Sequence, residues 1–404
     1  MIMRILQLCP QFPFPPTDGG KIGMLSITKS LVDNGAYVHV LCLSRTIPSD
    51  KDIQGFKEYT GADISCIQHN TKNTLMSIFL SVFNSIYPLY ITKHRSEHFK
   101  YAIKDILQKC TFDGIFCDHS CMIESALWGA TKQKGIPVFV RLHNIEFKIW
   151  ERYADRLLSR FNPVHWFIAS QAKKLKSFEA MHYDKVSMCY AITHHDAMIA
   201  KHISPQASIS TLTAGVYFNT LIPDYTIEKI PHRMIHASTF DWIHNREALY
   251  WFLKEVFPAI KAQILYAELV VLGKHIPEGI MNMKNQDIFA KGFVPSIVPE
   301  YSAASFFIAP LFVGSGIRIK ILEAMSLGLP VLASSIAAEG ILATANQGLI
   351  ICDNAEDFAK HSVFLMNHPH IAQTLGVEAR KYIVQNHSWD EIGKTIILDF
   401  QRLT

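Results

Sequence analysis

The sequence has few charged residues and no sustained apolar run. Only 18% of its 404 residues are Asp, Glu, Lys or Arg, and the net charge is +4, so there is no reason to expect a nucleic-acid partner. The most apolar window, residues 75–91, contains three serines, an asparagine and a proline, which a free-standing membrane span rarely combines. We expect this window to form a buried or interfacial helix instead.

The sequence also lacks the marks of secretion and of a metal site. The first 20 residues have no basic start and no long apolar run, because four prolines interrupt them. The eight cysteines have no metal-binding spacing, and Cys117-Asp118-His119 with Cys121 is better explained as a strand end that feeds a loop. We expect a cytoplasmic protein with free, buried thiols, no metal ion and no other cofactor.

Short apolar runs alternate with helical patterns along the whole chain. This alternation predicts an α/β fold with parallel sheets, and the length favours two domains. Ligands of such sheets bind at the carboxyl ends of the strands. The expected strands span residues 3–9, 37–44, 62–68, 114–118, 137–143, 185–192 and 208–216, then 234–240, 269–273, 288–294, 305–311, 330–334 and 349–352.

Residues 305–335, SFFIAPLFVGSGIRIKILEAMSLGLPVLASS, predict a strand, a glycine loop, a helix and another strand. A helix start beside glycines offers unpaired backbone N–H groups that suit a phosphate, and Arg318 and Lys320 add charge there. The carboxylate of Glu323 suits the two hydroxyl groups of a ribose. Taken alone, Gly314-Ser315-Gly316 is more often an ordinary turn with a helix cap.

The whole string is more specific than its parts. The pattern G-S-G-I-R-I-K-x-L-E-A-M-x-x-G-x-P-V, with Glu339-Gly340 after the next strand, resembles the nucleotide-sugar site of GT-B glycosyltransferases of family 4. The resemblance implies two Rossmann-like domains whose parallel sheets face a cleft, and sugar transfer with retention of configuration. It implies that Glu323 binds the ribose of the donor. The residues it places against the donor sugar and diphosphate are Gly314, Ser315, Gly316 and Ile317.

Two departures from the family pattern bear on the donor site. Many members have an acidic residue where this chain has Ser315, which leaves one contact to the donor sugar unassigned. Many also carry an Arg and a Lys in the turn after the first strand of the second half, where this chain has Asp241 and Asn245. We assign the diphosphate to Arg318 and Lys320, and keep Asp241 and Asn245 as further candidates.

Two loops of the first half extend the predicted site. In the first, Gly19 and Gly20 form a turn after an Asp cap, or they line the donor phosphate, as the family implies. In the second, His143 and Glu146 are a general acid/base pair, or they mark a helix start with a first-turn acid. The family places a histidine at this strand end beside the transferred sugar, so we assign that contact to His143. Asn144 and Glu146 are candidates from the same HN-x-E motif.

The resemblance also locates the domains. Residues 214–217, AGVY, resemble the N-G-V-D boundary motif of the family, with the first and last residues as departures. A polar linker framed by two prolines follows. We predict an acceptor-side domain over residues 1–220, a nucleotide-sugar domain over 221–386, and a terminal helix over 387–404 that packs back on the first domain.

The expected function is glycosyl transfer from a nucleotide sugar to a glycan or lipid-linked acceptor in cell-surface polysaccharide synthesis. Two alternatives remain open: a nucleotide-sugar epimerase of the same fold, and a non-catalytic sugar-nucleotide-binding protein. No two acids are placed convincingly for a hydrolase. A helical region over residues 147–182 carries basic and aromatic residues, which give either a solvated face or a face for anionic lipids. Together with residues 75–91 it motivates a peripheral contact with the inner face of the cell membrane.

Overall fold

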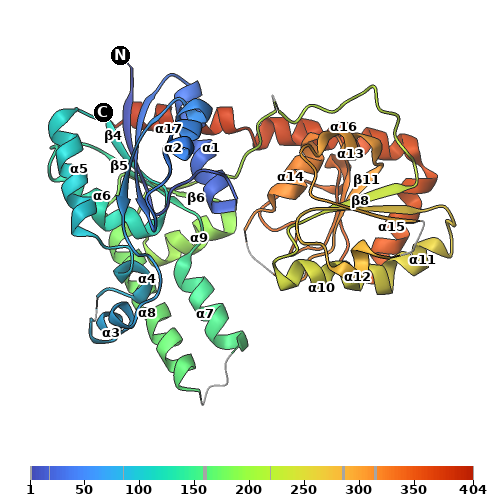
Figure 1. Ribbon diagram of the computed structural model, residues 1–404, viewed down its shortest axis with the longest axis horizontal. Helices are drawn as coiled ribbons and strands as arrows, with labels where there is room; N and C mark the ends of the chain where they lie inside the picture. Colours follow the sequence, from blue (N-terminus) through green and yellow to red (C-terminus); the bar gives the residue numbers. More distant parts are fainter. Residues whose placement is uncertain are drawn as a thin grey trace. The chain divides into compact units, whose positions relative to one another are not determined.

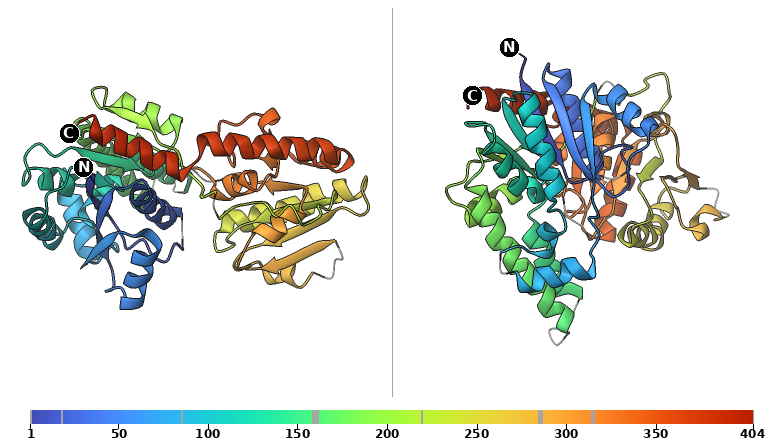
Figure 2. Two further views of the ribbon diagram at one scale, coloured as in Figure 1. Left: turned by 90° about the horizontal axis from the view of Figure 1, so that it is seen from above. Right: turned by 60° about the vertical axis from the view of Figure 1, so that its left-hand side comes forward.

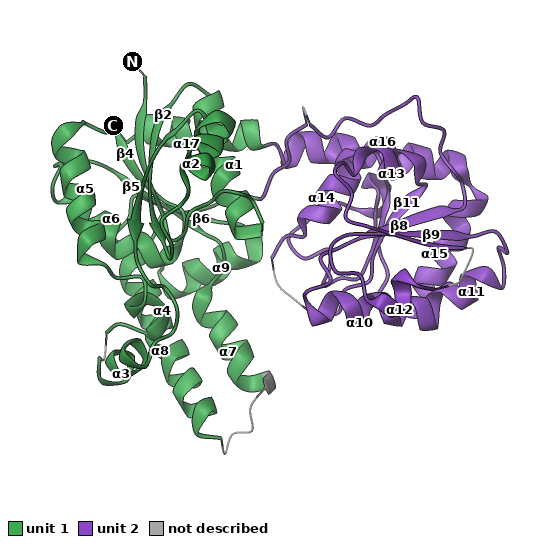
Figure 3. Ribbon diagram, viewed as in Figure 1, with its two compact units in different colours: residues 1–213, 389–404 green, residues 214–388 purple. Residues whose placement is uncertain are grey.

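The computed structural model describes residues 2–17, 19–84, 86–157, 162–218, 220–283, 287–313 and 316–403. The chain forms two compact units (Figure 3). Unit 1 contains residues 1–213 and 389–404, and unit 2 contains residues 214–388. The sequence-based boundaries lay after residues 220 and 386.

Unit 1 is built on a parallel sheet of seven strands in the order β3-β2-β1-β4-β5-β6-β7 (Figure 1). The inner strands are mostly apolar because helices cover both faces of the sheet, whereas the two edge strands contain more polar residues. They are β1 (Arg4–Cys9), β2 (Tyr37–Ser44), β3 (Asp63–Gln68), β4 (Gly114–Cys117), β5 (Val138–Leu142), β6 (Met188–Ala191) and β7 (Ile209–Thr211).

The helices of unit 1 lie on both faces of this sheet and below it in Figure 1. They are α1 (Gly19–Asp33), α2 (Asp50–Thr60), α3 (Leu75–Phe83), α4 (Leu89–Thr92), α5 (Glu97–Lys109), α6 (Ile123–Ala130), α7 (Glu146–Leu157), α8 (Pro163–Tyr183), α9 (His194–Ile203) and α17 (Trp389–Gln401), with a 3-10 turn over Ser120–Met122.

Unit 2 repeats the plan with a parallel sheet of six strands in the order β10-β9-β8-β11-β12-β13. Its strands are β8 (Arg233–Ala237), β9 (Glu268–Leu272), β10 (Ile288–Gly292), β11 (Phe306–Ala309), β12 (Val331–Ala333) and β13 (Leu349–Ile351). Its helices are α10 (Ile243–Trp251), α11 (Phe257–Lys261), α12 (Glu278–Met281), α13 (Val298–Ala303), α14 (Ile319–Ser326), α15 (Ala355–Asn367) and α16 (Pro369–Asn386), with a π turn over Phe252–Val256 and a 3-10 turn over Ala345–Gln347.

The predicted fold class is confirmed, because every predicted strand forms and all described strand pairs are parallel. Most of the observed strands are shorter than predicted, whereas β2 and β9 have the predicted length. The largest difference is at residues 208–216, where only Ile209–Thr211 pair in the sheet. The chain then leaves unit 1, and Val216 pairs with Ser388 in unit 2.

The terminal helix α17, dark red in Figure 2, packs within unit 1. The Phe400 ring stacks on the Phe139 ring of β5 at a centroid distance of 3.8 Å. Gly114 of β4 has no room for a side chain, since an added Cβ would lie 2.1 Å from Phe400. Trp389, at the start of α17, is buried against the guanidinium of Arg141, which lies 5.7 Å from its ring centroid.

Two predictions about helices need correction. The single helical region predicted over 147–182 is two helices, α7 and α8, which lie side by side below the sheet in Figure 1. Pro163 cannot continue a helix and instead begins α8, where the Asn162 side chain accepts from Val164 N at 2.9 Å. The helix expected over 75–91 is also two, α3 and α4. Of the two placements left open, α3 does not take the buried one, since Leu75 is 88% exposed and Phe83 74%, and the interfacial one stays a prediction.

The cysteines are free, as predicted, although Cys66 and Cys110 are only partly buried. In the part of the chain that the structure describes, no helix is both long enough and apolar enough to cross a membrane.

Candidate functional site

In unit 2, α14 and the residue before it carry the charged side chains that the sequence singles out. It follows β11, so these side chains lie at the carboxyl edge of the sheet. The helix begins at Ile319, later than the predicted start beside the glycine loop. Arg318 has an extended backbone, and its Nη1 donates to Gly316 O at 2.8 Å, so Gly316 and Ile317 precede the helix. Gly314 and Ser315 lie outside the described residues.

Lys320 is the mostly buried cation of this edge. Its Nζ donates to Ser238 Oγ at 3.1 Å, and Ser238 follows β8. Burial, with a contribution from the Arg318 charge, lowers the pKa of Lys320 to about 7. Ser238 is itself fixed by backbone packing, because a Cβ on Gly273 would lie 1.6 Å from Ser238 O. Sequence reasoning missed Ser238, because the strand predicted over 234–240 includes it, whereas the observed strand β8 ends at Ala237.

Glu323, one turn further along α14, is the mostly buried acid. Burial raises the pKa of its carboxyl group to about 7. Among the described residues its carboxylate has no hydrogen-bond or ion-pair partner. A mostly buried carboxyl group without a partner is costly for the unliganded fold, and groups of this kind are candidates for ligand contacts.

Asp241 and Asn245 lie after β8 at the same edge of the sheet. The Asp241 carboxylate is 2.7 Å from His275 Nδ1, and the Asn245 amide donates to Thr239 O at 2.7 Å. Through these contacts, both side chains stabilise the turn between β8 and α10.

In unit 1, Asp118 is the centre of a buried polar network at the carboxyl ends of β1, β4 and β5. Its Oδ1 lies 2.7 Å from His143 Nε2 and accepts from Arg141 Nη1 at 3.4 Å. Its Oδ2 accepts from Gln7 Nε2 at 3.1 Å. Burial opposes ionisation of Asp118, but the His143 hydrogen bond and the Arg141 charge outweigh it and lower the pKa of Asp118. The network therefore holds a carboxylate that fixes the orientation of the His143 imidazole.

A second group of side chains lies beside His143. The His119 ring stacks on the His143 ring at 4.9 Å, and His119 Nδ1 is 2.7 Å from Tyr90 OH. His119 Nε2 is 3.7 Å from Glu146 Oε1. Burial lowers the pKa of His119 and raises that of Glu146 to about 7, although a hydrogen bond from Asn144 opposes the second shift. His143, Asn144 and Glu146 thus lie together, as their sequence spacing predicts.

Asp118, Arg141, Gln7, His119 and Tyr90 were not predicted as site residues. The pair Asp118-His119 was visible as a polar end to an apolar strand. Arg141 gave a weaker signal as the one charge within β5. The structure also explains why residue 23 of α1 is a glycine, because a Cβ on Gly23 would lie 2.8 Å from Arg141 Nη1.

Gly19 and Gly20 form the start of α1, at the carboxyl end of β1. An added Cβ on Gly19 would meet no atom within 4 Å, so packing inside the chain does not require a glycine there. The remaining reason for a glycine at this position is a close approach of the backbone to a ligand.

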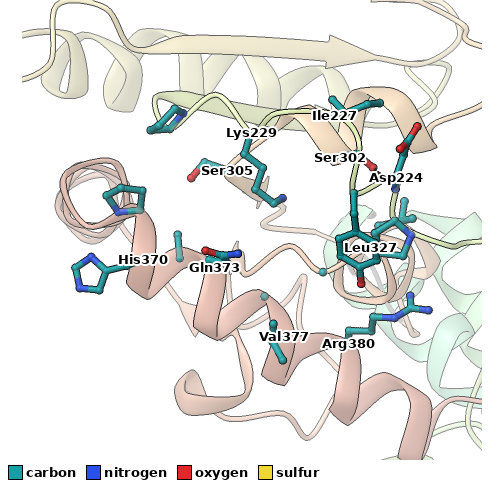
Figure 4. A pocket seen from close by; sticks show the side chains of 17 residues that line it. Asp224, Ile227, Lys229, Ser302, Ser305, Leu327, His370, Gln373, Val377 and Arg380 are labelled. Atoms are coloured by element: carbon teal, nitrogen blue, oxygen red, sulfur yellow. Dashed lines mark hydrogen bonds between the residues drawn. The ribbon is translucent and has the colours of Figure 1, made fainter.

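A hollow of about 530 Å³ in unit 2 lies away from these residues. Figure 4 shows it between the connector at 223–231 and α16. Lys229 Nζ donates to Ala304 O at 3.0 Å, and Arg380 Nη1 donates to Leu221 O at 3.0 Å. It lies by Ser305, at the amino end of β11, whereas α14 leaves from the carboxyl end of that strand. None of the predicted site residues lines it.

The residues described contain no group of three or more His, Cys, Asp or Glu side chains arranged to hold a metal ion.

The stability of unit 1 should depend on the buried acid Glu179. Its Oε1 accepts from Glu146 N at 3.1 Å, and burial, then the Glu146 charge, raise the pKa of Glu179 to about 8. A carboxyl pKa that is higher in the folded than in the unfolded protein stabilises the fold below the unfolded pKa, and this stability is lost as pH rises through the folded value. We expect the unfolding free energy to fall between pH 6 and pH 9, and Glu179→Gln to reduce that fall by roughly 1–3 kcal/mol.

Denaturant unfolding at the two pH values measures this effect. Glu58→Gln, at an exposed acid of α2 in the same unit, is the matched control and should keep the wild-type pH dependence. An unchanged pH dependence in Glu179→Gln would contradict the assignment.

Residues 231–368, most of unit 2, match the family model described as Glycosyl transferases group 1. A Klebsiella pneumoniae protein, "Uncharacterized 44.6 kDa protein in cps region", is 21% identical over 417 residues, which cover 97% of this chain and 98% of that protein.

Two solved structures resemble the whole chain. Sucrose-phosphate synthase from Thermosynechococcus elongatus has a TM-score of 0.66 at 15% identity and covers 99% of both chains. HepE from Anabaena, solved in complex with UDP, has a TM-score of 0.64 at 12% identity and covers 99% of this chain and 100% of its own. Identities this low show a shared fold.

Proposed function

We propose that this GT-B chain, whose residues 231–368 belong to the family Glycosyl transferases group 1, moves a hexose from a nucleotide sugar to a glycan or lipid-linked acceptor with retention of configuration. The observation that carries the proposal is the mostly buried pair Lys320 and Glu323 at the carboxyl edge of unit 2. Each is ionisable, burial disfavours its charge, and the matched family region contains both. A bound ribose supplies hydrogen-bond donors for the Glu323 carboxylate, and a bound diphosphate supplies negative charge for Lys320.

The donor half of the proposed site is assembled on α14 and the loop before it. Glu323 accepts hydrogen bonds from the ribose, and Arg318 and Lys320 neutralise the diphosphate, whose negative charge grows as the sugar leaves. Gly316 and Ile317 approach the donor with their backbone, and Gly314 and Ser315 are assigned with them from the sequence. The solved HepE complex contains UDP, which makes a uridine diphosphate sugar the first donor to test.

In the proposed first-domain half, His143 contacts the transferred sugar, with Asn144, Glu146, Gly19 and Gly20 nearby. Asp118 is fully buried and already receives three side-chain donors, so it orients His143 and is out of reach of a sugar carbon. Retention then relies on reaction of the acceptor hydroxyl on the face that the diphosphate leaves. The chain contributes positioning and charge stabilisation.

The epimerase and the non-catalytic binding protein are separated from a transferase by one experiment. The purified chain is incubated with a panel of nucleotide sugars, with and without an extract of lipid-linked and soluble glycans as acceptors. A transferase consumes donor and releases nucleoside diphosphate only when acceptor is present. An epimerase converts the sugar without acceptor, and a binding protein shows thermal stabilisation without turnover. The Klebsiella relative, named for a cps region, makes cell-surface polysaccharide the acceptor class to test first.

Metal should be dispensable for this reaction. The one D-x-D string, Asp50-Lys51-Asp52, occupies the first turn of α2. Ser49 Oγ caps this helix by accepting from Asp52 N at 3.1 Å, and it also donates to Asp52 Oδ2 at 2.7 Å. We expect unchanged turnover in excess chelator, because Arg318 and Lys320 take the place of a cation on the diphosphate. Turnover that is abolished by chelator and restored by magnesium or manganese would contradict this.

The acceptor side of the proposal includes a peripheral contact with the inner face of the cell membrane through α3. This helix carries no charge, and its apolar side chains face outward. Lys174 of α8 holds its carboxyl end, with Nζ 2.6 Å from Ser81 O and 2.8 Å from Asn84 O. Lys174 is therefore a cap of α3 and not the lipid-facing lysine that the sequence suggested. The exposed apolar residues of the segment are Leu75, Met76, Phe79, Leu80, Val82, Phe83 and Ile86.

Sedimentation with anionic vesicles tests this contact. We expect Leu75→Glu to weaken vesicle binding about tenfold or more, because a large apolar side chain contributes roughly 1.5–3 kcal/mol when it leaves water. Leu398→Glu, at a 52% exposed leucine of α17, is the matched control and should bind as the wild type does. Equal binding by the two variants would overturn the assignment of α3. Lys173→Gln with Lys176→Gln should weaken binding mainly at low salt.

A further inference from the structure

A hollow of about 840 Å³ in unit 1 is not used by the donor assignments above. The loops after β1 and β2 line it, together with the end of α4 and His119. It therefore opens at the carboxyl edge of the sheet, where parallel α/β sheets bind ligands. His119 connects it to the side chain of His143, since the two rings stack.

The hollow has an excess of positive charge. Lys21, Arg45 and Lys93 line it, whereas Asp52 is the one carboxylate among its described lining residues. Asp52 is already engaged, because Ser49 Oγ donates to it at 2.7 Å and it stands in the first turn of α2. Asp52 is therefore not paired with Arg45 or Lys93 in the part of the chain that the structure describes.

Arg45 and Lys93 approach the hollow from different segments. Arg45 Nε donates to Thr71 Oγ1 at 3.0 Å, and this hydrogen bond orients the guanidinium. Arg45 forms no ion pair with a carboxylate among the described residues. Lys93 Nζ lies 5.7 Å from the Tyr90 ring centroid and has no hydrogen-bond or ion-pair partner among the residues described. Burial is the main cause that lowers the pKa of Lys93; the Arg45 charge acts in the same direction, whereas Cys121 and the Glu146 carboxylate act against it. Two cations that repel each other in this way are stabilised by an anion between them.

The histidines of the hollow supply hydrogen bonds instead of charge. Burial lowers the pKa of His94 to about 4, and it also lowers that of His119. His94 Nδ1 is bonded to Tyr90 O at 2.7 Å, and the Tyr90 hydroxyl is bonded to His119. The lining thus combines cations with neutral ring nitrogens and hydroxyl groups, as suits the oxygens of a phosphate ester.

We propose that this hollow binds the phosphate or diphosphate group of a lipid-linked acceptor. The inference rests on the proposed glycosyl transfer and names the acceptor's chemical class. Tyr90 belongs to α4, and α4 packs against the outward-facing apolar helix α3. A phosphate held by Arg45 and Lys93 therefore lies next to the element that suits the hydrocarbon of the same molecule.

The test compares three probes: farnesyl diphosphate, farnesol and inorganic pyrophosphate. Binding is measured in detergent by titration calorimetry for the wild type, for Arg45→Gln with Lys93→Gln, and for Lys104→Gln. Lys104 is exposed on α5 and outside the hollow, so it is the matched control for loss of charge. All variants leave unit 2 unaltered, so a difference between them reports on the hollow. Thermal melts verify that each variant folds.

We expect the double variant to bind farnesyl diphosphate roughly a hundredfold more weakly, about tenfold for each charge removed. Farnesol should bind weakly to all three proteins, and Lys104→Gln should match the wild type. Unchanged farnesyl diphosphate binding in the double variant, or farnesol binding as tight as that of the diphosphate, would overturn the proposal. Pyrophosphate that binds as tightly as farnesyl diphosphate would assign the hollow to a free phosphate and overturn the lipid-linked part.

Nucleotide-sugar affinity is measured on the same samples to separate this inference from the proposed function. If the wild type binds no nucleotide sugar, the proposed function fails while the farnesyl diphosphate result still decides the hollow. If nucleotide sugar binds equally to all variants and farnesyl diphosphate does too, the proposed function stands and the phosphate site is refuted.

Discussion

Glu323→Ala should abolish most of the donor affinity and leave the fold intact. A carboxylate that holds a ribose forms charge-assisted hydrogen bonds, and each lost bond costs roughly 1.5–3 kcal/mol. We therefore expect kcat/KM to fall about ten- to hundredfold for Glu323→Gln, and further for Glu323→Ala. The measurement is donor affinity and steady-state turnover for each variant.

Glu323→Gln should weaken donor binding but should not destabilise the unliganded protein. Burial raises the pKa of Glu323 to about 7, above its ordinary value of 4.5. The ionised form is therefore disfavoured in the folded protein, and its cost to stability increases as pH rises through 7. Glu323→Gln removes that cost, so the unliganded variant should melt at or above the wild-type temperature at pH 8. A contact that only held α14 in place would instead lower the melting temperature.

Glu356→Gln is the matched control for this pair of effects, since Glu356 is an exposed acid on α15 of the same unit. It should change neither donor affinity nor the melt. Near-normal kinetics for Glu323→Ala, with an intact fold, would remove the central residue of the proposed donor site and favour a different function for unit 2.

His143→Ala should reduce turnover by about two to three orders of magnitude while nucleoside diphosphate affinity stays near the wild-type value. The imidazole is held by Asp118 at 2.7 Å and by stacking on His119, so its position is fixed before substrate binds. The nucleotide contacts proposed on α14 do not involve it. Single-turnover kinetics and nucleotide titration measure the two quantities separately.

His202→Ala, at an exposed histidine of α9, is the control and should leave turnover unchanged.

Asp118→Asn tests the support of His143 and should also destabilise unit 1 by about 3–5 kcal/mol, because it leaves Arg141 buried without its carboxylate. If His143→Ala turned over normally, the histidine would serve only the packing of the loop after β5.

The sequence by itself determined the architecture, because its signals are local. An apolar run such as residues 37–44 is continuous where a strand is covered on both faces, so every strand could be placed within a few residues. Glu323 and Lys320 were predicted for the same reason, since a short motif on one helix contains both. Their isolation from partners was not visible in the motif, because it depends on which side chains the neighbouring strands bring to that edge.

Only the tertiary structure decided which residues gather in unit 1. Asp118 meets Gln7 across 111 positions of sequence and Arg141 across 23, and no periodicity connects residues at such separations. Lys174 lies within the basic helical region predicted over 147–182, but its amine donates to carbonyls at the end of α3, 90 and 93 positions away. Arg45 and Lys93 share a hollow for the same reason. Parallel strands bring the loops after their carboxyl ends to one edge, and the chain order of those loops does not reveal which side chains then face each other.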